Sequence, residues 1–279
     1  MRIPLIAALI LPALLVGLSS AQSANASPGV ALVARTLSSM DQGGQGASPQ
    51  FEVATIKPSN PANCCARWWQ GHGRRLASHN TSLRWLIRMA YGLNDRQIVG
   101  GPAWMDDLRF DVSGEIEGTR IPADREWRVA VQKLLADRFQ LRFHHGSREM
   151  SAYALVTAKG GPKLDRDDQF KSLLIFNGDV GQTMRGYGRN VTLEEFIGEV
   201  QRLVLDRPVV DRTGITGTFD LNLVFTREDP NSPDMVELPD NAAPNLTNAL
   251  QQQLGLKLEK VKAPVDVLVI DKAEKPSPD

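Results

Sequence analysis

Four histidines could act as bases or metal ligands in this chain: His72, His79, His144 and His145. None of them forms a helical pair of histidines with a nearby glutamate, so the sequence lacks a zincin-type metal site. His144 and His145 are neighbours on a predicted strand, where adjacent side chains point to opposite faces. We therefore expect no metal shared by this pair, and we predict neither a metal site nor a cofactor for the chain.

Acidic residues are the next source of chemistry. Asp111 and Asp220 occupy matching places in a repeat described below, which could indicate the paired carboxylates of a glycosidase. Each lies between apolar neighbours of a predicted strand and so on its outer face, and we expect solvated or turn-bonding carboxylates. Asp211 follows an apolar strand as a phosphoacceptor would, but a capped turn is the preferred interpretation. The acidic segment 227–241 has three prolines and no EF-hand spacing, which favours a flexible insertion over a calcium site.

The segment 63–75 departs from the rest of the chain. It holds both cysteines, two of the five tryptophans, three arginines and one histidine. Aromatic and arginine side chains together are typical of interface hot spots and of sites for sugars or aromatic ligands. The alternative is that a tryptophan caps the core while the arginines are solvated. The proposed binding residues are Trp68, Trp69, His72, Arg74 and Arg75.

Cys64 and Cys65 are adjacent and are the only cysteines. A bond between them would be strained, because consecutive Cα atoms are about 3.8 Å apart and ordinary disulfides need about 4.4 to 6.8 Å. Such a strained disulfide, an intermolecular disulfide and free thiols all stay open. We expect an exposed loop that does not staple the fold.

Two segments of the chain share one pattern in one order, from about Arg75 to Lys163 and from about Gly186 to Pro276. Each begins with an amphipathic helix, for which Ser82 and Thr192 are predicted N-caps. A short apolar stretch, an alternating strand, a second helix and two further strands follow. The pattern places Leu86 with Phe196, and Leu135 with Leu250, in equivalent buried positions.

The predicted class is therefore α+β, with two tandem similar lobes, each a small mixed sheet with two helices packed on one face. The predicted divisions are a signal peptide at 1–26, a flexible lead-in at 27–50, a first repeat at 51–163, a linker at 164–185 and a second repeat at 186–279.

Composition and the amino-terminal segment limit the function classes. The formal net charge of +0 argues against nucleic acid as a partner. One arginine precedes an apolar run that ends near a small-residue site at Ala24-Asn25-Ala26, which indicates export with cleavage. The run is too short and too interrupted by proline for a stable membrane span. The expected location is periplasmic or extracellular.

Several phrases carry a resemblance to a known family: FEVATIKPS, LIRMAYGL, IVGGPAWM, LLADRFQLRFHH, YALVTAKGGPKL, RPVVDRTGITGTFDL, ALQQQLGLKLEK and VLVIDKAEKPS. In this order they resemble a soil-associated family of secreted bacterial proteins with a domain of unknown function. The resemblance implies export and no assigned activity. Each half also resembles, on fewer residues, the short N-terminal domain of secretins and TonB-dependent receptors, which implies a periplasmic docking or signalling module.

Two function classes follow. The first is an exported, non-catalytic binding or docking module for a protein, cell-wall or small-molecule partner, because no set of nucleophile, base and orienter is evident. The second is an exported hydrolase with a site between the lobes. That site would need His79, His144 or His145 within hydrogen-bond reach of Asp111 or Asp220.

Overall fold

The first half of the protein is a four-stranded antiparallel sheet covered by helices. The computed structural model describes residues 48–60, 68–166, 172–178, 183–227 and 242–277, with the backbone alone for Trp68–His72. The strand order is β1-β5-β3-β2. The elements of this half are β1 (Phe51–Pro58), β2 (Trp68–His72), β3 (Arg75–Thr81), α2 (Leu83–Tyr91), η1 (Asp95–Gln97), β4 (Ile98–Gly100), α3 (Trp104–Asp107), β5 (Phe110–Ile116) and α4 (Asp124–Arg138).

The second half repeats this plan with a smaller sheet of order β10-β8-β7. Its elements are β7 (Leu173–Asn177), β8 (Thr183–Thr192), α5 (Leu193–Leu203), β9 (Val209–Asp211), β10 (Thr218–Thr226), α6 (Leu246–Ala249) and the π-helical turn η2 (Leu250–Leu254). Strand β7 and the first residues of β8 lie within the predicted linker 164–185, so this segment contributes to the second sheet. The predicted signal peptide lies outside the described residues, as does all of the predicted lead-in except 48–50.

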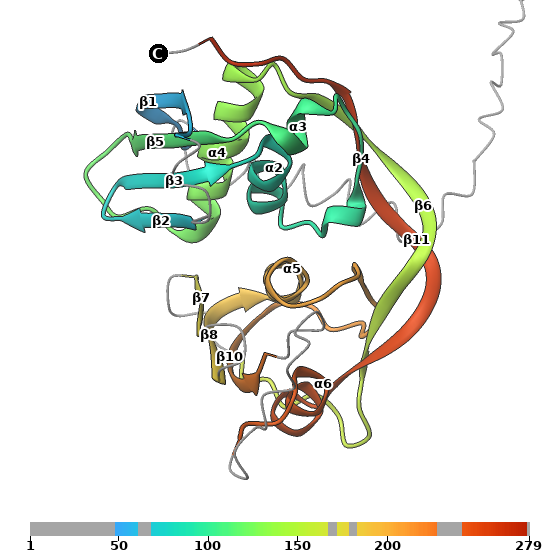
Figure 1. The fold of residues 1–279 in the computed structure, drawn as a ribbon. Coiled ribbons are helices and arrows are strands. Elements are labelled where there is room, and N and C mark those ends of the chain that lie inside the picture. The colour runs from blue at the N-terminus through green and yellow to red at the C-terminus, as the bar shows by residue number, and fades with distance from the viewer. Residues whose placement is uncertain (1–47, 61–67, 167–171, 179–182, 228–241, 278–279) are drawn as a thin grey trace, which may run out of the picture. The chain divides into compact units, whose positions relative to one another are not determined.

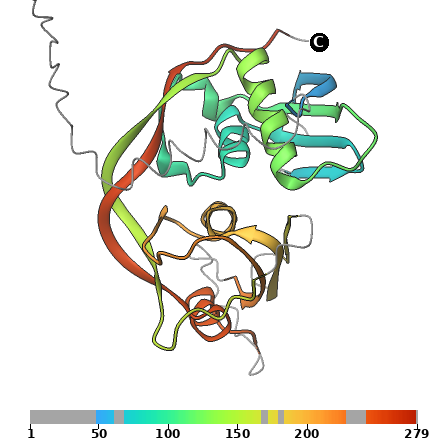
Figure 2. The same ribbon diagram turned by 180° about the vertical axis from the view of Figure 1, so that it is seen from behind.

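Two long strands are shared by both halves: β6 (Arg142–Thr157) and β11 (Leu256–Lys272). They pair antiparallel along their length and form a third sheet of order β4-β11-β6-β9 (Figures 1 and 2). Strand β4 joins β11 in parallel at Leu268–Ile270, and β9 joins β6 in parallel at Tyr153–Leu155. The α+β class is confirmed, but the halves do not close separate mixed sheets as predicted.

The reason lies in how the two cores are composed. The first core contains Leu268 and Ile270 of β11, although β11 is the last strand of the second half. The second core contains Leu155 of β6, the last strand of the first half. The predicted pairs of short strands at the end of each repeat are therefore single long strands, because each strand begins at its own core and ends at the other.

The repeat is visible in local geometry as well as in element order. Asn80 and Asn190 both have positive φ, 50° and 49°, immediately before the first helix of each half. Ser82 accepts a hydrogen bond from the Trp85 N–H, and Thr192 from the Glu195 N–H, which confirms both predicted N-caps. The predicted equivalent residues Leu86, Phe196, Leu135 and Leu250 are all buried.

In each half, the turn that precedes the long strand contains a residue with a positive φ. Gln140 has a φ of 48°, and Gly255 at the matching place has a φ of 64°. A Cβ atom on Gly255 would lie 2.1 Å from the carbonyl oxygen of Gly161, so a side chain has no room there. The second half therefore requires glycine where the first half accepts glutamine.

Candidate functional site

The predicted binding segment 63–75 is described only in part. Cys64 and Cys65 lie outside the described residues. Trp68, Trp69 and His72 lie on β2, whose backbone pairs with β3 so that Trp68 is opposite His79 and His72 opposite Arg75. The sequence analysis did not predict this hairpin, because the segment has no regular alternation of apolar residues.

Arg74 and Arg75, the two arginines of the segment that the structure describes, are engaged within the fold. Arg74 and Arg75 both pair with Glu115 on β5, and Arg75 Nε lies 3.1 Å from Glu115 Oε2. Arg74 Nη1 also donates a hydrogen bond to the carbonyl oxygen of Ile116 at 2.9 Å. Arg74 therefore ties the hairpin to β5, while Arg75 is largely exposed. Of the two, Arg75 is the one available to a partner.

The two matching aspartates hold matching turns. Asp111 accepts a hydrogen bond from the Asn80 N–H at 2.9 Å, and Asp220 accepts one from the Asn190 N–H at 2.9 Å. These bonds hold the left-handed asparagines before α2 and α5. The two carboxylates belong to different sheets and form the turn-bonding groups that the sequence predicts.

His79, His144 and His145 each contact a different residue. His79 Nδ1 lies 3.6 Å from Asp111 Oδ2. His144 Nδ1 lies 2.8 Å from Asp271 Oδ1, and the His145 ring makes an edge contact with Phe143. Of the predicted His–Asp combinations, the contacts found in the described part of the chain join only His79 and Asp111. Within the described ranges, no three His, Cys, Asp or Glu side chains come together as metal ligands would.

Asp111 has a shifted pKa. Burial raises it, but the hydrogen bonds from Ser59 and Asn80 and the charge of His79 lower it by more, so the pKa is below its ordinary value. The ionised carboxylate therefore stabilises the fold above about pH 4, and this stabilisation disappears as the pH falls through the folded-state pKa.

We expect D111N to be less stable than the wild type at about pH 6, because Asn keeps the acceptor oxygen but not the charge. This difference in the free energy of unfolding should become smaller as the pH is lowered to about 2.5. Urea midpoints at several pH values measure this. S113A, which alters the next outward residue of β5, should show a difference that does not change with pH. A constant difference for D111N would contradict the assignment.

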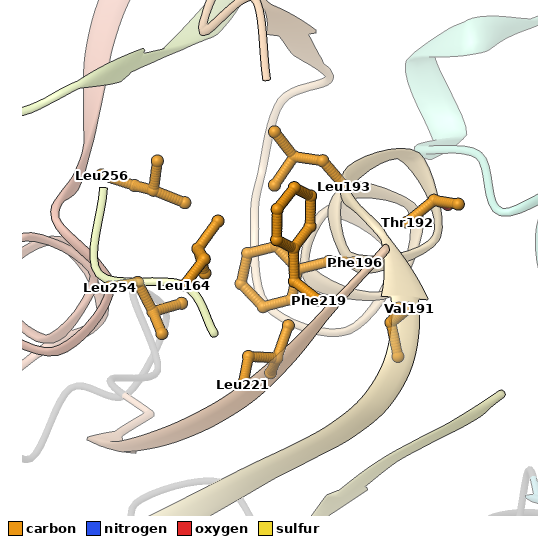
Figure 3. Close-up of a pocket in the computed structure, with 9 residues that line it drawn as sticks. All are labelled: Leu164, Val191, Thr192, Leu193, Phe196, Phe219, Leu221, Leu254 and Leu256. Carbon is orange, nitrogen blue, oxygen red and sulfur yellow. The ribbon is translucent and has the colours of Figure 1, made fainter. Parts of the chain in front are cut away.

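A pocket in the second core is too small for a ligand. Figure 3 shows Phe196 and Phe219 among the apolar side chains around it. The cavity measures about 10 Å³, which is at most one water molecule. It is a packing gap, and the functional surface has to be sought outside the core.

An exposed apolar surface lies on the outer side of the second sheet. We call it the β7–β8 face, and it consists of Leu173, Ile175, Arg185, Tyr187 and Arg189. Leu173, Ile175 and Tyr187 are 38%, 39% and 41% exposed, and they are three of the six exposed large hydrophobic residues in the described part of the chain. Ile175 is directly opposite Tyr187 in the strand register, and the Arg189 guanidinium lies 5.9 Å from the centre of the Tyr187 ring.

The sequence analysis missed this face because it assigned residues 164–185 to a linker. The signal was the apolar run Leu173-Leu174-Ile175-Phe176, bounded by segments without periodicity. Only pairing with β8 shows which residues of that run point outward, since Leu174 and Phe176 pack on the second core. Periodicity alone does not separate such a strand from a loop that carries a few apolar residues.

A buried charged cluster lies where α4 of the first half meets α5 of the second. Glu199 accepts hydrogen bonds from both Arg128 and Arg202. Burial, and to a smaller extent the charge of Arg202, lowers the pKa of Arg128 to about 10, and burial lowers the pKa of Arg202 to about 10. Both guanidinium groups still carry a charge at neutral pH. Glu199 is the carboxylate that pairs with both, and the charges of Asp124 and Glu195 also act on Arg128.

Neutral hydrogen bonds surround this charged cluster. Gln201 Nε2 donates to the Gly92 carbonyl at 2.7 Å, and Asn94 Nδ2 donates to the Leu205 carbonyl at 3.1 Å. Gly198 lies against Gly92, where a Cβ atom would be 3.4 Å from the Gly92 carbonyl oxygen. The cluster and these bonds fasten the halves together.

Comparison with known proteins gives a family. A family model described as "Protein of unknown function (DUF3738)" matches residues 84–273. The matched range runs from α2 through β11 and covers the first half from α2 onward, the second half and the long strands β6 and β11, but not β1, β2 and β3. Neither the curated proteins nor the solved structures contain a match to this chain. No helix in the described ranges is long and apolar enough to cross a membrane.

Proposed function

The chain belongs to this family of unknown function, and we propose that it is an exported, non-catalytic docking module that binds a protein partner through the β7–β8 face. The matched range includes the first half from α2 onward, the second half and the shared strands, so the β7–β8 face lies within it.

The observation that carries the proposal is the exposed apolar row on the second sheet. Leu173, Ile175 and Tyr187 adjoin one another across β7 and β8 and are flanked by two arginines. Tyrosine and arginine around aliphatic side chains are the composition of protein interfaces, and desolvating such a surface favours binding. The other side of the same sheet already buries its apolar residues in the second core.

Export is supported by the sequence at the amino terminus, where a charged start, an apolar run and a small-residue site succeed one another. The resemblance of each half to the short N-terminal domain of secretins and TonB-dependent receptors supports docking as the task, since those domains act as periplasmic docking or signalling modules. Segment 63–75 stays a second proposed contact region, with Arg75 as its exposed described residue.

The alternative of a hydrolase would use His79 and Asp111. In the second half the place of His79 is taken by Arg189, which pairs with Asp220 at 3.8 Å. An arginine cannot act as a general base, and yet the surrounding turn is the same. The common task of both pairs is therefore to hold the turn, which favours the docking function.

Photo-cross-linking tests the proposal. We expect benzoylphenylalanine at position 187 to give one discrete cross-linked product in cells that export the protein. The same residue at position 53, an exposed valine of β1, is the matched control and should give none. Identical products from both positions, or no product from position 187, would contradict docking through this face.

A further inference from the structure

The β7–β8 face differs from the equivalent surface of the first half, although the two halves share their fold. On the outer side of the first sheet the contacts are polar: Thr55 and Ser113 share a hydrogen bond of 2.8 Å, and Arg75 pairs with Glu115. Ala77 lies three residues before the left-handed Asn80, and Tyr187 lies three residues before Asn190. The tyrosine is therefore not required by the fold, because the same turn forms with alanine at that place.

The edge of the second sheet is partly occupied. The Leu174 N–H donates a hydrogen bond to Asp124 Oδ2 of α4 at 3.4 Å. This N–H would otherwise be open to a strand added beside β7. A partner is accordingly expected on the face of the sheet, where the side chains of Leu173, Ile175 and Tyr187 are, rather than along its edge.

Two arginines, Arg185 and Arg189, lie on this face. Arg185 is exposed, and no carboxylate pairs with it in the described part of the chain. Arg189 lies above the Tyr187 ring and has one carboxylate, Asp220, at 3.8 Å. Among the described residues, Arg185 is therefore the arginine of this face that has no carboxylate partner. Arginine beside an aromatic ring pairs readily with carboxylates, so the complementary partner is acidic.

We propose that the β7–β8 face binds an acidic peptide segment of a partner protein, in which leucine or valine side chains cover Leu173, Ile175 and Tyr187 while glutamate or aspartate pairs with Arg185. This inference rests on the proposed docking function and adds the chemistry of the partner. It requires both the apolar row and Arg185, and each can be altered separately.

The probe is a fluorescein-labelled peptide of twelve residues that combines leucine and glutamate, titrated with the protein from Ser27 onward, which keeps the predicted lead-in. Two matched peptides carry lysine for glutamate, or serine for leucine. We expect only the acidic, leucine-containing peptide to raise the anisotropy. Y187A, which installs the residue of the first half, should weaken binding by about tenfold or more. R185E should reverse the preference toward the lysine peptide.

V53A is the control, because Val53 is exposed on the first sheet, and it should leave the affinity unchanged. Equal binding of the acidic and basic peptides, or unchanged binding by Y187A, would overturn the inference. So would sedimentation with anionic lipid vesicles without peptide binding, which would make the surface a membrane contact. If the peptides fail while cross-linking at position 187 still captures one protein, the docking function stands and the acidic chemistry is wrong.

Discussion

E199Q should lower the free energy of unfolding by roughly 3 to 5 kcal/mol, because it removes the carboxylate that pairs with two largely buried guanidinium groups. Glutamine has nearly the shape of glutamate, so the loss reports the missing charge. Arg128 and Arg202 are held between α4 and α5, where burial already lowers the pKa of each to about 10. Urea denaturation followed by circular dichroism measures the change.

Glu115 provides a matched control, because it also pairs with two arginines. Glu115 pairs with Arg74 and Arg75, but these side chains are partly or largely exposed. E115Q should cost less than about 1 kcal/mol. Replacing Arg128, Glu199 and Arg202 together with methionine should recover most of the stability lost in E199Q, since a buried ion cluster is often replaceable by apolar residues of similar volume. Equal losses in E199Q and E115Q would show that the cluster does not behave as buried.

L250A should destabilise the protein by roughly 2 to 5 kcal/mol and should shift the unfolding of the first half along with that of the second. Leu250 is buried in the second core, whereas all five tryptophans lie at positions 68 to 127 of the first half. Tryptophan fluorescence therefore reports only the first half. Strands β6 and β11 contribute to both cores, so neither core can lose them alone.

Leu135 is the equivalent residue of the first core and provides the comparison. L135A and L250A should both move the fluorescence midpoint, and the circular dichroism midpoint should move with it. If L250A alters circular dichroism in a separate early transition and leaves the fluorescence midpoint in place, the halves unfold independently. The long strands β6 and β11 would then couple the two halves less strongly than their pairing indicates.

Part of the candidate site could be predicted from the sequence, and part of it depends on the tertiary structure. The place of Asp111 and Asp220 between apolar strand residues predicted solvated or turn-bonding carboxylates, and both accept a hydrogen bond from an asparagine N–H. The binding role of segment 63–75 stays a prediction, although Arg74 is engaged by Glu115 and Ile116. The β7–β8 face was missed, because exposure of Leu173 and Ile175 depends on which side of the strand meets the core.

The sequence by itself determined what depends on neighbours along the chain. The helices over Leu83–Tyr91 and Leu193–Leu203 follow from apolar spacing, and their starts follow from Ser82 and Thr192. The order of elements in each half follows from the repeat. Each of these features is set by residues within a few positions of one another, so a local pattern contains the information.

Only the tertiary structure decided how the halves combine. Whether β6 ends after one core or continues into another depends on pairing with β11, more than a hundred residues away along the chain. The contact of Glu199 with Arg128 likewise joins α5 to α4, and neither helix shows in its sequence that a charge on it is buried. Strand pairing and buried charge are long-range properties, because both are fixed by the packing of segments whose separation in sequence bears no relation to their distance in space.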